Sequence, residues 1–203
     1  MIQRLFKKAS VLTLTTALIA CSSAPKESAP TVNLSPSVSV TLPQPSELGY
    51  SLTASQLISA TWQADRTSRS EQLPVHLQVN QDKVVLAGFS SWGTRILSLE
   101  YQASSITTDV LAGLEGSLPK PEQVLFNLMI TLWPSSAWEG PLNEVRWRVI
   151  DTENSRAVFD NHGQQVIDIR YSQSDKLAGD IEFHNLTSDY AITIKTLQYN
   201  QAP

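Results

Sequence analysis

An alternation of apolar and polar residues runs through most of the chain after residue 47, and it constrains the fold more than any other feature. In the segment 75–79, for example, Val75, Leu77 and Val79 alternate with polar residues. Successive side chains of a β-strand point to opposite faces, so this pattern predicts strands with one buried and one solvated face. The same spacing recurs over 94–101, 144–149, 167–171, 181–183 and 190–195. Turn-like tripeptides at 80–82, 91–93 and 161–163 predict hairpins, and hence a meandering antiparallel sheet.

Residues 121–133 break this alternation and predict a helix. Pro121 suits a first helical position, Glu122 lies in the first turn, and Pro134 ends the segment. The segment is apolar on almost every side, apart from a narrow polar stripe formed by Gln123, Asn127 and Thr131. A surface helix has a wider polar face, so we expect this one to lie in the concave side of a strongly curved sheet. These residues leave open whether it is a plain core helix or lines a ligand cavity.

The first twenty residues have the layout of a bacterial secretion signal. The basic start is formed by Arg4, Lys7 and Lys8. The apolar stretch 9–20 that follows is shorter than the ~20 residues of a membrane-spanning helix. It closes on Leu18, Ile19, Ala20 and Cys21, which resembles the lipobox of bacterial lipoproteins. The resemblance implies removal of residues 1–20 as a signal peptide, a diacylglycerol anchor on the Cys21 thiol, and acylation of the new amino terminus, for example with palmitate.

The residue after the cysteine predicts where the protein is sorted. In the enterobacterial systems that this signal resembles, an aspartate in that position retains a lipoprotein in the inner membrane, whereas this chain has Ser22. The resemblance therefore implies an outer-membrane lipoprotein that faces the periplasm. Each acyl chain contributes ~0.8 kcal/mol per buried methylene group, so several chains make a lasting anchor.

The segment that follows differs in composition from the rest of the chain. Residues 22–47 include five prolines and seven serines, which is typical of a disordered linker. We therefore expect the acylated Cys21 and a disordered tether over 21–47. A mature chain of this length usually forms one domain, which we place at 48–203.

Charge and cysteine content exclude several functional classes. Removing residues 1–20 takes away three basic and no acidic residues, so the formal net charge changes from −4 to −7. Nucleic-acid binding needs a basic face, and the mature chain has no cluster of Lys or Arg. Cys21 is the only cysteine, so acylation leaves no thiol for a disulfide or a thiolate metal site. We expect a monomer that binds no nucleic acid.

The residues give no positive indication of an enzyme. The run 88–93 contains two glycines and two serines, but the glycine spacing is wrong for a nucleophile elbow. The best candidate for a metal site is an alternating trio, Asp180, Glu182 and His184. A solvated strand face explains that trio better, because no pair of histidines has metal-binding spacing. We expect no catalytic residue, no metal and no cofactor.

The order of these features resembles the lipoprotein-localisation factors LolA and LolB, of which LolB is lipidated. The resemblance rests on the lipobox, the proline-rich leash, a hairpin at 89–94, and an apolar helix that ends in Leu132, Trp133 and Pro134. The run 123–128, the same helix end, Arg156 before a hairpin and the closing strand at 190–194 also resemble a lipoprotein family of unassigned function. That family accompanies aryl polyene gene clusters.

This resemblance implies a mainly β fold with a few helices (α+β), in which a strongly curved antiparallel sheet forms an unclosed barrel covered by helices. Its apolar hollow would accept the acyl chains of a lipoprotein or another lipid, with an aryl polyene lipid as one candidate, and a LolA-like periplasmic carrier would be a partner. The cavity candidates are Leu97, Leu99, Val124, Phe126, Leu128, Ile130 and Trp147. Simple core packing is the alternative for each of them.

LolB proteins carry a protruding apolar residue on a hairpin loop that is believed to enter the membrane. The matching position here is Trp92, where the family pattern has leucine. A tryptophan suits an interfacial contact, and it equally suits a residue folded back onto the sheet.

Two functions follow as alternatives. The first is a lipid or lipoprotein acceptor that delivers its cargo to the outer membrane. The second is a scaffold lipoprotein that holds no ligand and assists outer-membrane assembly through its surface. A large apolar hollow beside the helix at 121–133 favours the first alternative, and a tightly filled interior favours the second.

Overall fold

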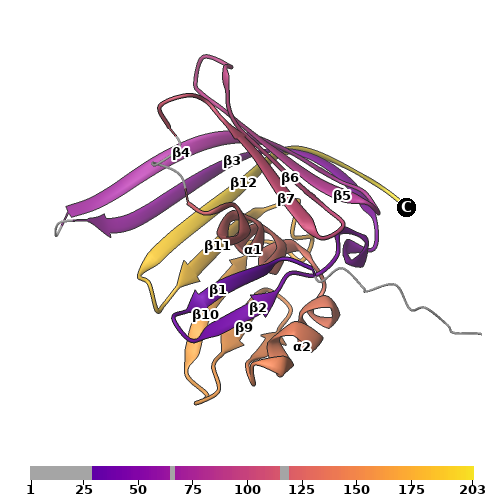
Figure 1. Ribbon diagram of the computed structural model, residues 1–203, viewed down its shortest axis with the longest axis vertical. Coiled ribbons are helices and arrows are strands. Elements are labelled where there is room, and N and C mark those ends of the chain that lie inside the picture. Colours follow the sequence, from indigo (N-terminus) through magenta and orange to yellow (C-terminus); the bar gives the residue numbers. More distant parts are fainter. Residues whose placement is uncertain (1–28, 65–66, 115–118) are drawn as a thin grey trace, which may run out of the picture.

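The computed structural model describes residues 29–64, 67–114 and 119–203 of the chain (Figure 1). The predicted signal peptide, the lipobox and Cys21 lie outside the described residues. Within those three ranges, no helix has the length and apolar character needed to cross a membrane.

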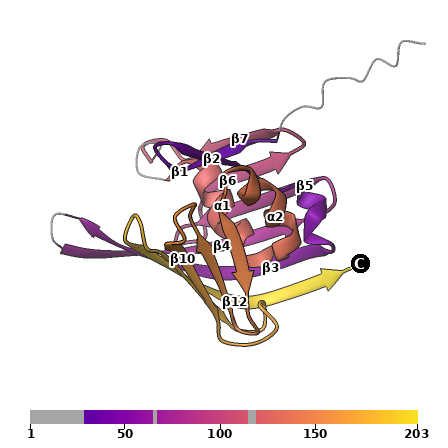
Figure 2. The ribbon, with the colours of Figure 1, turned by 90° about the horizontal axis from the view of Figure 1, so that it is seen from below.

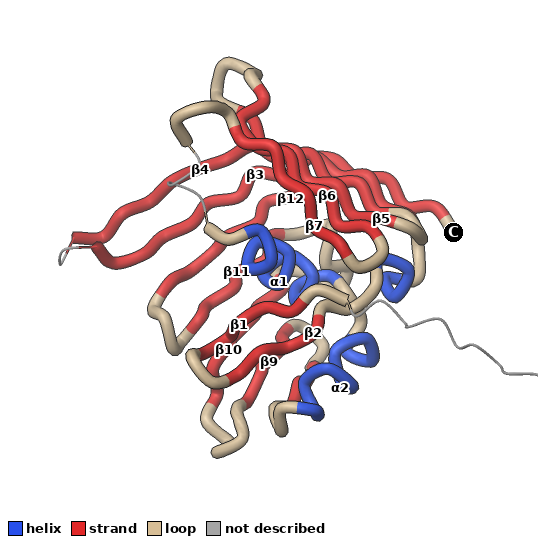
Figure 3. The backbone as a smooth tube through the Cα atoms, viewed as in Figure 1, coloured by secondary structure: helices blue, strands red, loops and turns tan. Residues whose placement is uncertain are grey.

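A ten-stranded antiparallel sheet dominates the described part of the chain (Figure 1). Its strands are β3 (Ser51–Ala64), β4 (Thr67–Val79), β5 (Lys83–Phe89), β6 (Arg95–Gln102), β7 (Ser105–Val110), β8 (Arg148–Asp151), β9 (Ser155–Phe159), β10 (Gln165–Tyr171), β11 (Asp180–Asn185) and β12 (Tyr190–Ala202). Their order is β7-β6-β5-β4-β3-β12-β11-β10-β9-β8. The sheet curls strongly, and β7 and β8 are its two edges, so the barrel is unclosed (Figure 3). The predicted fold class is confirmed.

The alternating pattern placed the strands well, because burial of one sheet face is what the pattern reports. In β6, for instance, Leu97 and Leu99 are buried, while Ser98 and Glu100 on the other face are partly exposed. The turns at 80–82, 91–93 and 161–163 each join consecutive antiparallel strands. All the alternating segments lie in strands except the one at 144–149.

The predicted strand at 144–149 is wrong up to Trp147. A second helix, α2 (Ser135–Glu144), occupies the preceding segment, and β8 begins only at Arg148. Arg146 has a left-handed backbone with φ of 62°, and the Trp147 amide donates to the carbonyl of Leu142 at 2.9 Å. Trp147 is therefore buried by the turn that ends α2. Gly140 and Pro141 conceal this helix in the sequence, since both residues disfavour a helix interior.

The predicted helix is present as α1 (Pro121–Leu132) and lies across the concave face of the sheet (Figures 1 and 2). It contacts β7 on one side and β11 on the other. The side chains of its central turns have no solvent exposure; these are Leu125, Phe126, Met129 and Ile130. Phe126 meets the α2 residue Trp138 edge to face, with ring centres 5.3 Å apart. The helix therefore fills much of the hollow.

The predicted disordered tether over 21–47 is wrong from Thr31 onwards. Residues 31–48 form a hairpin of β1 (Thr31–Ser35) and β2 (Val38–Thr41), followed by a short 3-10 helix, Pro45–Leu48. β1 contacts α1 and β2 contacts α2, so the hairpin lies against the helices at the open side of the barrel. Val32, Val40 and Leu42 are each only 1% exposed. Their apolar alternation was present among the prolines and serines, but the composition obscured it.

Candidate functional site

The carboxyl end of α1 is fixed by side chains from the sheet and from α2. A helix leaves its last carbonyls without partners inside the helix, and Pro134 prevents α1 from continuing. The guanidinium Nη1 of Arg156 donates to the carbonyl oxygens of Ile130 at 2.6 Å and Trp133 at 2.8 Å. The Tyr171 hydroxyl donates to Thr131 O at 2.9 Å, and Trp138 Nε1 donates to Met129 O at 3.3 Å. These bonds hold one end of α1 rigidly.

Arg156 is fully buried, and its charge is balanced by Asp151 at the end of β8. Burial alone raises the pKa of the Asp151 carboxyl, but hydrogen bonds and charge from Arg156, with Lys176 and Ser135, hold that pKa below its usual value. Burial, aided by the charge of Arg156, lowers the pKa of Lys176 to about 8. The Lys176 ammonium lies 4.9 Å from the centre of the Tyr171 ring. Arg156 and Tyr171 bond α1 directly, and Asp151 and Lys176 lie against these two side chains, so we assign all four a structural role.

The amino-terminal end of α1 is far less enclosed, and an apolar cleft opens beside it. Pro121 and Val124 are only partly buried. The cleft has a volume of about 280 Å³ and lies between the start of α1 and the two strands β6 and β7. Its lining residues are Leu97, Leu99, Thr108, Val110, Pro119, Pro121 and Val124. Thr108 alone among them has a polar side chain, so the cleft suits an apolar ligand.

The cleft forms where the sheet ends. Leu97 pairs with Val110 and Leu99 pairs with Thr108, so these side chains of β6 and β7 form one continuous wall. β7 is an edge strand, so among the described residues no further strand extends this wall beyond Thr108 and Val110. The first turn of α1 lines the cleft as well.

The structure divides the predicted cavity residues into two groups. Leu97, Leu99 and Val124 line the cleft. Phe126, Leu128, Ile130 and Trp147 lie in the closed core instead, none more than 6% exposed. The remaining cleft residues were not predicted. Alternation over 105–110 would have indicated Thr108 and Val110, whereas no local pattern points to the two prolines, because only the position of α1 brings them to the cleft.

Trp92 lies at the tip of the β5–β6 hairpin and is 92% exposed. The turn is held by the Ser90 amide, which donates to Thr94 O at 2.8 Å, and by Ser90 Oγ, which accepts from the amides of Trp92 and Thr94. Gly93 has φ of 80°, a conformation that favours glycine. The indole therefore projects into solvent and does not fold back onto the sheet.

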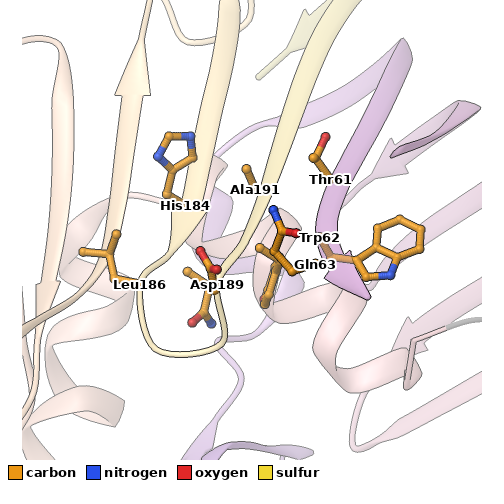
Figure 4. Close-up of a pocket in the computed structure, with 9 residues that line it drawn as sticks. Thr61, Trp62, Gln63, His184, Leu186, Asp189 and Ala191 are labelled. Carbon is orange, nitrogen blue, oxygen red and sulfur yellow. The ribbon is translucent and has the colours of Figure 1, made fainter. Parts of the chain in front are cut away.

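A second hollow, of about 220 Å³, lies where β3, β11 and β12 run side by side (Figure 4). His184 pairs with Ala191, which in turn pairs with Thr61, so a methyl group lies between two larger side chains. Asp189 and Gln63 add polar groups at its rim (Figure 4). This hollow is an open depression on the sheet surface with polar side chains at its rim.

The predicted trio of Asp180, Glu182 and His184 lies along the exposed face of β11. Of the three, only His184 borders the second hollow. Across the ranges that the structure describes, no group of three His, Cys, Asp or Glu side chains is placed to hold a metal ion.

The fold and the cleft define an unclosed antiparallel β-barrel with a helix in its concave side and an apolar opening at one sheet edge. The chain belongs to the family described as "Protein of unknown function (DUF3261)", whose profile matches residues 53–198. No protein of curated function matches the chain in sequence.

Several solved structures are similar to the chain at low sequence identity. A domain from Vibrio parahaemolyticus, provisionally described as an outer membrane lipoprotein-sorting protein, has 7% identity and a TM-score of 0.39 over 74% of this chain and 85% of its own. A LolA superfamily protein from Nitrosomonas europaea has 7% identity and a TM-score of 0.38 over 79% and 94%. A DUF1329 family protein from Desulfovibrio piger has 8% identity and a TM-score of 0.32 over 74% and 85%.

Proposed function

We propose that the protein is an outer-membrane lipoprotein, anchored through Cys21 and facing the periplasm, that binds an acyl chain of a lipoprotein or lipid and assists its delivery to the outer membrane. The observation that carries the proposal is the apolar cleft between the edge of the sheet and the loosely enclosed start of α1. Such a cleft offers an acyl chain an alternative to water without any covalent chemistry.

The size of the cleft limits what it can hold. Pockets that enclose drug-sized ligands have volumes of ~300–1,000 Å³, and this cleft of about 280 Å³ lies just below that range. It therefore suits a single acyl chain, or part of one, and is too small for a complete three-chain lipoprotein anchor. Each methylene group buried there contributes ~0.8 kcal/mol.

Delivery requires contact with the target membrane, and Trp92 is the candidate for that contact. An indole is large, apolar and carries one polar N–H, which suits the boundary between acyl chains and headgroups. In this proposal a LolA-like carrier brings the cargo, for which an aryl polyene lipid is one candidate. The direction of transfer follows from the relative affinities of the carrier and of this protein for the cargo.

A second function, a scaffold that holds no ligand, is favoured by a different observation. The middle of α1 fills the concave side of the sheet so completely that Leu125, Phe126, Met129 and Ile130 have no exposure. In that alternative the cleft is a surface irregularity, and the protein acts through its outer faces during outer-membrane assembly.

Native mass spectrometry separates the two functions. The chain from residue 22 onwards contains every described residue and no cysteine, and it can be exported to the periplasm behind an ordinary secretion signal. We expect a bound lipid at one per chain, identifiable after organic extraction. A photo-crosslinking residue at Val124 should label that lipid, and one at Val149, which is also partly buried but lies on β8, should not. A lipid-free mass after incubation with lipids and lipoproteins would favour the scaffold.

A further inference from the structure

Trp92 has an apolar neighbour at the same end of the sheet. The Leu111 amide donates to the carbonyl of Ile96 at 3.0 Å, which places Leu111 beside the base of the hairpin that carries Trp92. Figures 1 and 3 show the β5–β6 hairpin and the segment that follows β7 side by side at the top of the molecule. Leu111 is 47% exposed, so two large apolar side chains project at this end.

The hairpin loop that carries Trp92 and the first residues after β7 contain no charge, whereas Glu115 and Lys120 come later in the second loop. The segments 90–94 and 110–114 read Ser-Ser-Trp-Gly-Thr and Val-Leu-Ala-Gly-Leu. Two of the charged residues that border these segments, Arg95 and Asp109, are exposed and pair with each other at 3.0 Å. A charge is costly to bring into hydrocarbon. The exposed charges nearest to Trp92 and Leu111 in β6 and β7 are paired with each other.

The proposed anchor would keep a membrane close to the domain. Its leash joins the fold beside Leu42, near Tyr101, at the end of β6 opposite the Trp92 hairpin. If Cys21 is acylated as proposed, nine residue steps separate the anchor from Pro30, which allows at most ~32 Å of extended chain. The hairpin β1–β2 is part of the fold, so its residues do not lengthen the flexible segment between Cys21 and the domain.

We propose, on the basis of the lipid anchor in the proposed function, that Leu111 is a second membrane-contacting residue, and that it and Trp92 together hold this end of the sheet in the lipid–water interface. The partner is a phospholipid bilayer. Two residues that line the cleft are next to this end of the sheet in the chain: Leu97 directly follows Ile96, and Val110 directly precedes Leu111. The cleft therefore opens next to the bilayer, and an acyl chain can pass between them with little exposure to water.

The test uses the full-length lipoprotein in vesicles of phosphatidylethanolamine and phosphatidylglycerol, without cargo. Leu111→Cys supplies a thiol for an environment-sensitive fluorophore, and Leu197→Cys is the matched control because Leu197 is 62% exposed on β12. We expect emission at position 111 to shift to shorter wavelength and to be quenched by lipids brominated on their acyl chains. The probe at position 197 should do neither.

Two results would overturn the inference and are distinguishable. If the parent protein floats with the vesicles but the probes at 111 and 197 behave alike, the anchor stands and the second contact is wrong. If the parent protein does not float, or its Cys21 thiol takes up the fluorophore, the proposed anchor is wrong and this inference falls with it. Neither readout depends on whether the cleft binds an acyl chain.

Discussion

Arg156 and Asp151 form a two-point ion pair at the carboxyl end of α1, with Nε–Oδ1 at 2.6 Å and Nη2–Oδ2 at 2.7 Å. The guanidinium is completely buried, whereas the carboxylate side chain keeps 33% of its exposure. Because the same guanidinium also bonds the carbonyls of Ile130 and Trp133 at the end of α1, this pair connects the carboxyl end of the helix to β8 and β9, while the cleft lies at the other end of the helix.

Loss of Arg156 should therefore destabilise the fold strongly. Arg156→Met leaves the Asp151 carboxylate and two helix carbonyls without their donor, and breaking a buried pair in this way costs ~3–5 kcal/mol. Urea unfolding measures the loss. Arg170→Met is the control, since Arg170 pairs with Asp168 on an exposed face and should cost less than about 1 kcal/mol. Equal effects of the two substitutions would show that Arg156 does not hold the helix end.

Lys176 should make stability rise with pH in the alkaline range. Its pKa in the folded protein is about 8 against an ordinary value of 10.5, so between these values the unfolded chain binds more protons than the folded one. The slope of the unfolding free energy with pH is then positive. Burial raises the pKa of Tyr171 to about 12, so its ionisation in the unfolded chain opposes the effect above about pH 10.

Comparison with Lys176→Met isolates this contribution. Urea unfolding of both proteins from pH 7 to pH 10 should show the parent gaining stability relative to the variant as pH rises. Parallel curves would mean that the Lys176 ammonium is well solvated in the folded protein.

Local patterns predicted α1 and at least part of β4, β6, β10, β11 and β12, because each of these elements carries its own signal. Pro121 and Pro134 bracket the helix in the sequence, and strand faces follow from alternation. The role of Arg156 could not be predicted in this way. Arg156 lies on the buried face of β9 together with Val158. From the sequence alone, an arginine in a strand is expected on the exposed face, because the groups that bind it in the core are not adjacent in the chain. Those partners come from β8 and α1, which only the curved sheet brings together.

The cleft was predictable only in part for a similar reason. Leu97 and Leu99 follow from the pattern of β6, but the opening exists because β7 ends the sheet and because α1 starts beside it. Phe126 and Ile130 were predicted to line the cavity but lie in the closed core. The sequence of an apolar helix does not reveal whether its side chains line a cavity or fill it. The packing of α1 against α2 decides between these outcomes.

Filling the cleft should reduce lipid binding without unfolding the protein. Val124→Phe places a larger apolar side chain in a partly open site, so we expect a smaller lipid-bound fraction in native mass spectra and little change in melting temperature. Val149→Phe, at a partly buried valine of β8, is the matched control and should leave the bound fraction unchanged. Unaltered binding in both variants would place the lipid elsewhere.

Trp92 should be needed for delivery and not for folding. Trp92→Glu puts a charge at the hairpin tip, where the side chain is 92% exposed and contributes little to the core. We expect an unchanged circular dichroism spectrum and melting temperature, together with loss of lipoprotein transfer to outer-membrane vesicles. Leu186→Glu changes another exposed apolar residue, at the β11–β12 turn, and should transfer normally. Normal transfer by Trp92→Glu would exclude insertion of this hairpin.

The hairpin β1–β2 should behave as part of the fold and not as a tether. Val40 is 1% exposed, and two hydrogen bonds fix the chain just after it: the Tyr101 hydroxyl donates to Pro43 O and Trp133 Nε1 donates to Gln44 O, each at 3.1 Å. Val40→Ala removes two buried methyl groups and leaves a gap, which should lower the free energy of unfolding by about 1.5–3 kcal/mol. Ser39→Ala, on the exposed side of the same strand, should change it by less than about 0.5 kcal/mol. If Val40→Ala were equally silent in urea unfolding, residues 31–41 would not be packed on α1 in solution, and the leash from Cys21 would be long enough to release the domain from the membrane surface.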